Sequence, residues 1–315
     1  MPKPKPSSCE AIAPSSSANI GPGFDVFGLA LDLFYDKVKL RKLESRSGLI
    51  TTRFSNNTDI PTNTEQNSAS LAIKSMVNKY GISNDIEITI AKKVPHGYGL
   101  GSSASSAVAS VCALNHLFNL GIDKEELVEF AAEGEIASSG TKHYDNVAAS
   151  LLGGFIIVRT QPKLEVIRIE PPSELVMVIG IPRVNVPNKK TAVARSILPK
   201  RVSLKKVTHN IFNSSTVVSG FLLKDPILIG KGINDEIVEP VRKRMITGYD
   251  IVKKNSLNAG ALATTISGAG PSIISFSNQR NIAVNIAKSM RRSFLQVGIQ
   301  STIHICNSSK GARII

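Results

Sequence analysis

The segment Pro95-His96-Gly97-Tyr98-Gly99-Leu100-Gly101-Ser102-Ser103-Ala104 places three glycines within five positions, directly ahead of a long Ala- and Ser-rich apolar stretch. Glycine permits positive φ and lets the backbone approach a ligand closely. A helix N-terminus adds free N–H groups and the positive end of the helix dipole. Together these features predict a phosphate-binding loop at the start of a helix.

Residues 86–91 precede this loop and alternate apolar and polar side chains, which is typical of a half-buried strand. Strand, glycine loop and helix therefore follow in the order that a nucleotide site needs. The loop is not a P-loop, because no lysine precedes its serines, and it is not a clean dinucleotide GxGxxG fingerprint with its downstream acidic residue. On the loop alone, a flexible glycine turn before an ordinary core helix remains the alternative.

The composition is that of a globular protein, with 315 residues, 42% of them hydrophobic and 20% charged, a length that suits two domains. Three widely spaced cysteines, Cys9, Cys112 and Cys306, predict neither a disulfide framework nor a zinc site. No apolar stretch reaches membrane-spanning length, and the N-terminus lacks the apolar core of a signal peptide. We therefore expect a cytoplasmic protein without a membrane partner.

A formal net charge of +14 fits either a nucleic-acid binder or a basic surface around an anionic small-molecule site. The basic pairs of the second half are scattered rather than gathered in one arm. Aromatic residues make up only 5% of the chain and Trp is absent, so platforms for base stacking are scarce. We therefore favour a small anionic ligand and expect no nucleic-acid partner.

The hydrophobic periodicity predicts a mixture of helices and strands. Helices are expected over 68–80, 124–136 and 240–258, and strands over 38–43, 151–158 and 175–181. A proline-containing boundary lies around residues 162–172. The coarse prediction is an α+β protein of two lobes, residues 1–165 and 166–315.

Two further glycine-containing segments accompany the loop at 95–104, one at residues 14–25 (PSSSANIGPGFD) and one at residues 267–272 (SGAGPS). In sequence and order the three resemble the signature motifs of the GHMP small-molecule kinases, a family named for galactokinase, homoserine kinase, mevalonate kinase and phosphomevalonate kinase. The resemblance spans nearly the whole chain. It implies an N-terminal, ATP-binding lobe like ribosomal protein S5 domain 2 and a ferredoxin-like C-terminal lobe, with the acceptor between them.

Within this family the chain resembles the branch that acts on homoserine. The likeness lies in the first motif, in residues 140–148 with 153–155, and in residues 191–199 and 235–242. It implies ATP-dependent phosphorylation of the side-chain hydroxyl of L-homoserine to O-phospho-L-homoserine, a step of threonine biosynthesis. A homodimer is plausible from the same resemblance.

The resemblance also implies the ATP and magnesium sites. The nucleotide-binding positions are Asn67, Pro95, Gly97, Gly99, Leu100, Gly101, Ser102 and Ser103. Glu135 is the expected Mg²⁺ ligand, assisted by Ser103, because magnesium prefers hard oxygen ligands. Two alternatives come from the residues alone: Asn67 would also serve as a helix N-cap, and Glu135 as a solvated carboxylate at a helix end.

Homoserine carries an ammonium, a carboxylate and a hydroxyl, and a selective pocket offers a partner to each. Asp25 can pair with the ammonium, and an arginine matches a carboxylate with two parallel hydrogen bonds, which favours Arg195 and Arg242. Asn19 and His143 are expected to orient polar groups. In a strongly basic chain, either arginine could instead be an ordinary surface residue, and Arg242 has two basic neighbours.

The catalytic positions are expected at Glu135, Asp145 and Asn146. Mevalonate-kinase-like members place an aspartate where it can take the acceptor proton, whereas the homoserine branch offers an asparagine. A carboxylate can act as a base and an asparagine cannot. The hypothesis is that Asn146 faces the acceptor and that no side-chain base operates, but adjacency leaves Asp145 open.

Three competing functions remain on the sequence alone. One is a kinase of the same family that acts on another alcohol, such as mevalonate or shikimate, although mevalonate has no ammonium for Asp25. Another is a non-catalytic binding module that keeps the fold, since fold alone does not prove activity. The third is nucleic-acid binding, for which steep salt dependence would be the sign.

Overall fold

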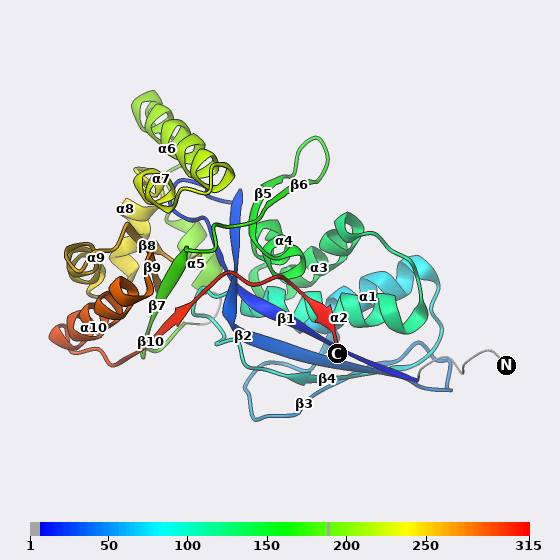
Figure 1. Cartoon of the computed structure of the whole chain (residues 1–315). Helices are drawn as coiled ribbons and strands as arrows, with labels where there is room; N and C mark the ends of the chain where they lie inside the picture. The colour runs from blue at the N-terminus through cyan, green and yellow to red at the C-terminus, as the bar shows by residue number, and fades with distance from the viewer. Residues whose placement is uncertain (1–6, 188–189) are drawn as a thin grey trace.

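The computed structural model describes residues 7–187 and 190–315, which form two lobes lying side by side (Figure 1). The first lobe contains β1 (Ser8–Ala18), β2 (Phe27–Lys42), β3 (Ile50–Phe54), η1 (Thr64–Gln66), α1 (Ser68–Tyr80), β4 (Ile86–Ala91), α2 (Ser102–Phe118), α3 (Lys124–Ser139), α4 (Tyr144–Leu152), β5 (Phe155–Arg159) and β6 (Glu165–Ile169). The last strand, β11 (Arg313–Ile314), returns to this lobe.

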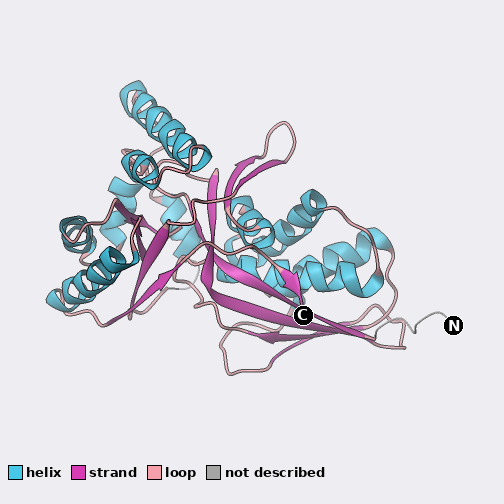
Figure 2. Cartoon of the chain, viewed as in Figure 1, coloured by secondary structure: helices cyan, strands magenta, loops and turns pink. Residues whose placement is uncertain are grey.

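The first lobe is built on a sheet of order β11-β1-β2-β4-β3, in which β5 also pairs with β2 and β6 with β5. Only β3 and β4 run parallel among these pairs. Four helices, α1 to α4, cover one face of the long strands (Figure 2). This layered arrangement places the helix after the glycine loop between the sheet and the outer helices.

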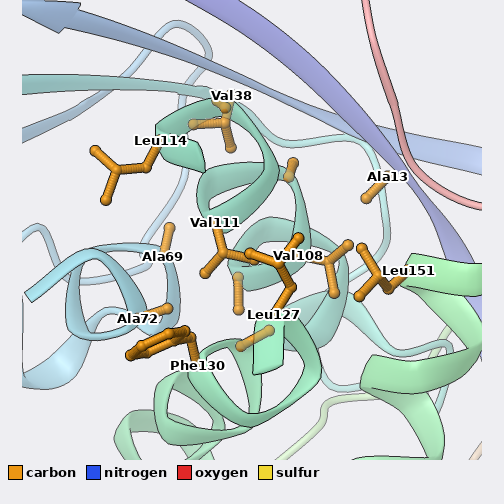
Figure 3. Packing of buried hydrophobic residues seen from close by; sticks show 14 of the residues in the cluster. Ala13, Val38, Ala69, Ala72, Val108, Val111, Leu114, Leu127, Phe130 and Leu151 are labelled. Carbon is orange, nitrogen blue, oxygen red and sulfur yellow. The ribbon is translucent and has the colours of Figure 1, made fainter. Parts of the chain in front are cut away.

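Helix α2 can occupy that central place because its sequence, SSASSAVASVCALNHLF, is rich in small residues. Its side chains Val108, Val111 and Leu114 pack against the sheet and the other helices (Figure 3). Small side chains let neighbouring elements approach closely and fill the interior without voids. The Ala- and Ser-rich stretch is therefore a buried helix that starts at Ser102.

The second lobe contains β7 (Val176–Pro182), α5 (Lys190–Ser196), α6 (Leu204–Leu222), α7 (Pro226–Gly232), α8 (Glu239–Arg242), η2 (Lys243–Met245), α9 (Tyr249–Asn258), β8 (Ala263–Ile266), β9 (Ile273–Ser277), α10 (Arg280–Gln296) and β10 (Ser301–Cys306). Its antiparallel sheet has the order β10-β7-β9-β8. With helices between β7 and β8 and between β9 and β10, this is the ferredoxin-like βαββαβ arrangement, as the sequence resemblance implied.

Strand β7 shows how this second sheet is held from both sides. Val176 and Val178 belong to the cluster formed with α9 and α10, whereas Met177 and Ile179 belong to a cluster shared with the first lobe. Side chains alternate between the two faces of a strand, so a continuous apolar run fits a strand that is buried on both faces.

The two lobes meet through aromatic rings. Phe155 of β5 stacks on Phe221 of α6 with centroids 3.8 Å apart and planes inclined by 7°, and Phe27 of β2 packs edge-on against Phe155 at 5.0 Å. Phe155 and Phe221 are fully buried. The shared cluster therefore fixes α6 against the first sheet.

Several predicted boundaries differ from the structure. The strand expected over 151–158 is the end of α4 followed by β5, separated by Gly153 and Gly154, both at positive φ. The helix expected over 240–258 is broken into α8, η2 and α9, with Gly248 at φ 79° before α9. The division expected at residue 165 falls at the start of β6, which belongs to the first sheet. No helix of the described ranges combines the length and hydrophobicity needed to cross a membrane.

The Phe155 stack predicts a large stability effect. Phe155→Ala is expected to lower the free energy of unfolding by about 3–5 kcal/mol, because it leaves a cavity between the lobes. Phe212→Ala on α6 is the matched control, since that side chain is 70% exposed and its loss should cost less than about 0.5 kcal/mol. Urea denaturation followed by circular dichroism measures both, and equal losses would contradict the packing role.

Candidate active site

The three glycine-containing segments come together at one place, although they are far apart in the chain. Ser267 Oγ donates to the carbonyl oxygen of Gly99 at 2.8 Å, and the Gly268 N–H donates to Ala18 O at 3.2 Å. The Ser16 N–H donates to Leu100 O at 3.0 Å. The first and third segments therefore support the glycine loop from both sides through its backbone.

The glycine loop needs its glycines for two physical reasons. Gly97, Gly99 and Gly101 have φ values of 82°, 75° and 65°, a region that side chains disfavour. A Cβ on Gly99 would overlap the Ser267 carbonyl oxygen, and one on Gly101 would overlap the Ser16 hydroxyl. The loop thus combines a backbone conformation that favours glycine with close packing against the other two segments.

The start of α2 leaves backbone donors for a ligand. Gly101 is the N-cap residue and provides no side-chain hydrogen bond, and Ser102 Oγ donates instead to Val94 O at 2.9 Å. Ser103, the next residue, lines the cavity described below. A long helix that begins without a side-chain cap offers N–H groups and a positive dipole end to an anion.

A buried ion pair that the sequence did not reveal holds this helix start. Lys92 pairs with Asp36 and also donates to the carbonyl oxygen of Ser102 and, at 2.8 Å, to Ser106 Oγ. Asp36 is fully buried and accepts from the N–H groups of Lys93 and Val94 at 2.8 and 2.9 Å. The two partners lie 56 positions apart and each has a charged neighbour in the sequence, so no local pattern signals the pair.

One cavity of about 210 Å³ opens beside the loop. It is lined by predicted site residues from both lobes: Asn19, Asp25, Gly97, Gly99, Leu100, Gly101, Ser102, Ser103, Glu135, His143, Asp145, Asn146, Arg195 and Arg242. His96, Phe24 and Lys190 also line it and were not among the predicted site residues. Only Asn67 and Pro95 of the predicted set are absent from its lining.

Asn67 is the N-cap of α1. Its side-chain oxygen accepts from the N–H groups of Ala69 and Ser70 at 3.1 and 3.2 Å, and its amide donates to Pro61 O at 2.8 Å. The capping alternative that the sequence left open is therefore present in the structure. A contact from Asn67 to a nucleoside stays a prediction.

Asp25 and Arg195 pair with each other rather than standing apart. The guanidinium donates to both carboxylate oxygens, at 2.8 and 2.9 Å, in a bidentate arrangement. Arg195 lies at the end of α5, 170 positions from Asp25, so the pair joins the two lobes across the cavity. Bidentate geometry strengthens the interaction and fixes the orientation of both groups.

Arg242 is the residue of its basic cluster that faces the cavity. It is 4% exposed, and its guanidinium donates to Ala194 O and Gly268 O, both at 3.2 Å. Its neighbours point elsewhere: Lys243 pairs with Asp250, and Arg244 is exposed. Burial lowers the pKa of Arg242 from its usual value.

The ring of Phe24 holds both arginines near each other. The guanidinium carbons of Arg195 and Arg242 lie 5.4 and 5.0 Å from the ring centroid. A cation over an aromatic face is attracted by the ring quadrupole. Phe24 thus brings two cations to one side of the cavity, where they can receive a carboxylate.

Asn19 connects the first and third segments. Its amide donates to Gly268 O at 2.9 Å, and its side-chain oxygen accepts from the Asp25 N–H at 3.2 Å. Asn19 and Asp25 have φ values of 71° and 58°, unusual for residues other than glycine. Strained backbone of this kind is retained where surrounding contacts enforce it, often at functional sites.

His143 and Glu135 face each other at the cavity wall, with His143 Nδ1 3.6 Å from Glu135 Oε2. Burial by itself lowers the pKa of His143, but the hydrogen bond and charge of Glu135 outweigh it and raise the pKa above the usual value. Glu135 is buried and shares the cavity with the Ser103 hydroxyl.

These oxygens fit a magnesium ion. Mg²⁺ usually takes one or two carboxylates and completes its shell with water and substrate phosphates. Among the described residues, no group of three His, Cys, Asp or Glu side chains is arranged to hold a metal alone. The donor set therefore suits an ion shared with a phosphate ligand at the loop.

Asp145 and Asn146 both reach the cavity from the first turn of α4. Asp145 Oδ1 accepts from the Asn146 N–H at 2.7 Å, and Asn146 Oδ1 accepts from Ser16 Oγ at 3.0 Å. Complete burial, with the negative charge of Asp25 as a further cause, raises the pKa of Asp145 to about 6. The first motif therefore orients the Asn146 amide.

Comparisons with known proteins agree with this geometry. Residues 67–154 match the GHMP kinases N terminal domain, and residues 217–296 match the GHMP kinases C terminal domain. A homoserine kinase of Thermoplasma volcanium is 36% identical over 302 residues, which cover 96% of this chain and 95% of that protein. A homoserine kinase of Chlorobaculum tepidum is 35% identical, with 96% and 97% covered.

Solved structures show the same fold. The crystal structure of homoserine kinase from Cytophaga hutchinsonii has a TM-score of 0.92 and 38% identity, covering 99% of both chains. A mevalonate kinase from L. major in complex with R-mevalonate has a TM-score of 0.74 at 16% identity, a likeness of fold alone. With both family domains matched and more than one third of the residues identical over nearly full length, this chain belongs to the GHMP kinase family.

Proposed function

We propose that this enzyme transfers the terminal phosphoryl group of ATP to the side-chain hydroxyl of L-homoserine, giving ADP and O-phospho-L-homoserine for threonine biosynthesis. The observation that carries the proposal is the charge pattern of one cavity. Asp25, Arg195 and Arg242 stand together beside the glycine loop. An amino-acid zwitterion needs one anionic and one cationic partner. Both lie here beside a loop that can bind the phosphates of a nucleotide. The names of the full-length relatives support the same substrate.

We assign the amino-acid groups of the substrate to the paired charges. The ammonium would share the carboxylate of Asp25, and the carboxylate would join the guanidiniums beside Phe24. Asp25 and Arg195 already neutralise each other. The substrate brings an ammonium to Asp25 and a carboxylate to Arg195, so the net charge of the group stays zero. Arg242, whose two hydrogen bonds to carbonyl oxygens orient it, supplies a further cation.

The transfer itself depends on positioning and on charge neutralisation. The bond between the terminal phosphorus and its bridging oxygen breaks, the acceptor oxygen forms the new bond, and the acceptor proton leaves. We infer that Asn146 orients the acceptor hydroxyl and that the proton passes to a phosphate oxygen or water. Backbone N–H groups at the start of α2 and the loop would hold the nucleotide phosphates.

Magnesium would be held by Glu135 with the Ser103 hydroxyl. When bound, the ion neutralises phosphate charge during transfer. His143 then keeps Glu135 oriented, since the two side chains face each other. A homodimer, a cytoplasmic location and the absence of a nucleic-acid partner stay predictions that no described residue tests.

A coupled assay of ADP release tests the proposal. Mg-ATP is supplied with L-homoserine, mevalonate, shikimate or L-serine as separate acceptors. Turnover with L-homoserine alone is expected. Turnover confined to another alcohol would keep the kinase and overturn the assignment of the amino-acid pocket, and ATP binding without turnover on any acceptor would favour a binding protein.

The bidentate Asp25–Arg195 pair predicts that Arg195→Lys selectively weakens the binding of homoserine. Lysine keeps the charge beside Asp25 but cannot form the bidentate pair, so the KM for homoserine should rise by roughly 10- to 100-fold. The KM for ATP should stay within about twofold of the wild-type value, as binding at the glycine loop is separate. Steady-state kinetics with Arg201→Lys, at an exposed position of the same lobe, serve as the control.

Asn146→Ala and Asp145→Asn distinguish a mechanism in which Asn146 orients the acceptor without a side-chain base from one in which Asp145 is the base. If Asn146 orients the acceptor, its removal should lower kcat by about 10²-fold or more, whereas Asp145→Asn keeps an acceptor oxygen for the Asn146 N–H and should cost less. The measurement is kcat at saturating substrates, with folding checked by circular dichroism. Unchanged kcat in Asn146→Ala together with a folded, inactive Asp145→Asn variant would establish Asp145 as the base.

The raised pKa of Asp145 predicts a pH-dependent stability effect. Its folded-state pKa of about 6 lies above the usual 3.8, so the fold favours the protonated carboxyl, and this contribution is lost as the pH rises through about 6. At pH 7.5, Asp145→Asn should therefore raise the free energy of unfolding by up to about 3 kcal/mol. The gain should shrink as the pH falls from about 6 toward 4. Urea titrations across this range measure it, and a gain that does not vary with pH would contradict the assignment.

A further inference from the structure

Lys190 is a cavity residue to which the proposed mechanism gives no task. It is the first residue of α5, it is buried, and it lines the same cavity as the glycine loop. Its ammonium donates to the carbonyl oxygen of Gly270 in the third segment. The position therefore brings a second-lobe cation to the place where the three segments meet.

The surroundings of Lys190 do not balance its charge. Over residues 7–187 and 190–315, no carboxylate lies within ion-pair distance of its ammonium, whereas Lys92, the other buried lysine near the loop, is paired with Asp36. Of the cavity carboxylates, Asp25 is paired with Arg195, Glu135 faces His143, and Asp145 accepts from Asn146. Burying a charge without an opposite charge is costly.

The charged groups that face Lys190 are themselves cationic or basic. Burial, and after it the positive charge of Arg242 on α8, lower the pKa of Lys190 to about 7. His96 in the glycine loop also lies close enough for its pKa to be lowered, through burial first and then through Lys92 and Lys190. An anion bound among Lys190, Arg242 and His96 would offset the repulsion between these basic groups.

The geometry connects Lys190 with the phosphate loop. The carbonyl oxygen of Gly270, which accepts from Lys190, lies 2.7 Å from the position that a Cβ on Gly99 would occupy. Val186, four positions before Lys190, contacts the loop in the same way, since its Cγ1 is 2.8 Å from a Cβ built on Gly97. Val186 and the Gly270 carbonyl that accepts from Lys190 thus both lie against the glycine loop.

We propose that Lys190 binds the phosphoryl group that is transferred, supplying the cation opposite the start of α2 and receiving its missing countercharge from that group. This inference rests on nucleotide binding at the glycine loop, as in the proposed function. It adds a charge from the second lobe to a phosphate site otherwise built from first-lobe backbone. Contact with a dianionic group favours the protonated amine, so binding should draw a proton from solution above pH 7.

The test is calorimetric binding to the full chain with Mg²⁺, using ADP and a non-hydrolysable ATP analogue at pH 8 in buffers of different ionisation enthalpy. The wild-type protein should take up a fraction of a proton with the analogue and less with ADP. Lys190→Met should lower the affinity for the analogue by roughly 10- to 100-fold and abolish the proton uptake. Its affinity for ADP should change by less than about threefold.

Two variants sharpen the result. Lys190→Arg keeps a permanent charge, so it should retain most of the analogue affinity but lose the proton uptake. Lys243→Met removes the same charge from a half-exposed position of the second lobe and should change neither the analogue affinity nor the proton uptake. Urea denaturation of Lys190→Met should show no loss of stability, because an unbalanced buried charge has been removed.

Each remaining outcome contradicts the inference in its own way. An equal loss of affinity for ADP and for the analogue would indicate that Lys190 contacts the phosphates that ADP also carries, not the transferred group. Unchanged binding and proton uptake in Lys190→Met would leave the residue without a ligand role. A lower unfolding free energy with unchanged binding would make it a structural clamp on Gly270. Because no acceptor is present, failure of homoserine turnover would refute the proposed function and leave this inference standing.

Discussion

The buried ion pair between Asp36 and Lys92 is the constraint on which the phosphate site depends. Asp36 lies in the middle of β2, and through Lys92 and two backbone N–H groups it fixes the chain between β4 and the glycine loop. Lys92 in turn donates to the first residue of α2. Removing one partner of a buried pair leaves an uncompensated charge, which costs far more than an exposed pair contributes. The sheet therefore sets the position of the helix start, and the helix start presents its N–H groups to the cavity.

The second lobe completes a site that the first lobe begins. The first lobe supplies the glycine loop, Glu135 and the Asp145–Asn146 pair, while the second supplies cations. Charges of opposite sign meet at the junction in the Asp25–Arg195 pair, and Phe24 positions both arginines. A cavity arranged in this way is electrostatically prepared before the substrate arrives, so little reorganisation is needed on binding. The apolar cluster around Phe155 and Phe221 gives the junction the rigidity that such alignment requires.

The sequence predicted the parts of this architecture that depend on local pattern. The glycine loop and the helix over 68–80 agree with the structure. The ferredoxin-like second lobe, which the family resemblance implied, also agrees. The sequence did not predict features that depend on distant partners, such as the Asp36–Lys92 pair and the burial of Lys190. Nor did periodicity locate the breaks at Gly153 and Gly248, because apolar residues continue on both sides of each glycine. Asp25 and Arg195 were each expected to face substrate, but their mutual pairing is visible only once both lobes are in place.

The return of β11 to the first sheet has a consequence for how the chain folds during synthesis. Ile314 pairs with Ala11 and Arg313 with Ile12, so the edge beside β1 is covered by residues that follow the second lobe in the chain. The preceding segment also packs tightly on the α4–β5 turn, where Gly153 and Gly311 admit no side chain. While the ribosome is still translating the second lobe, the first sheet must therefore wait with one edge open. The sheet is completed only after the second lobe has been synthesised, and until then the edge of β1 presents unpaired backbone groups.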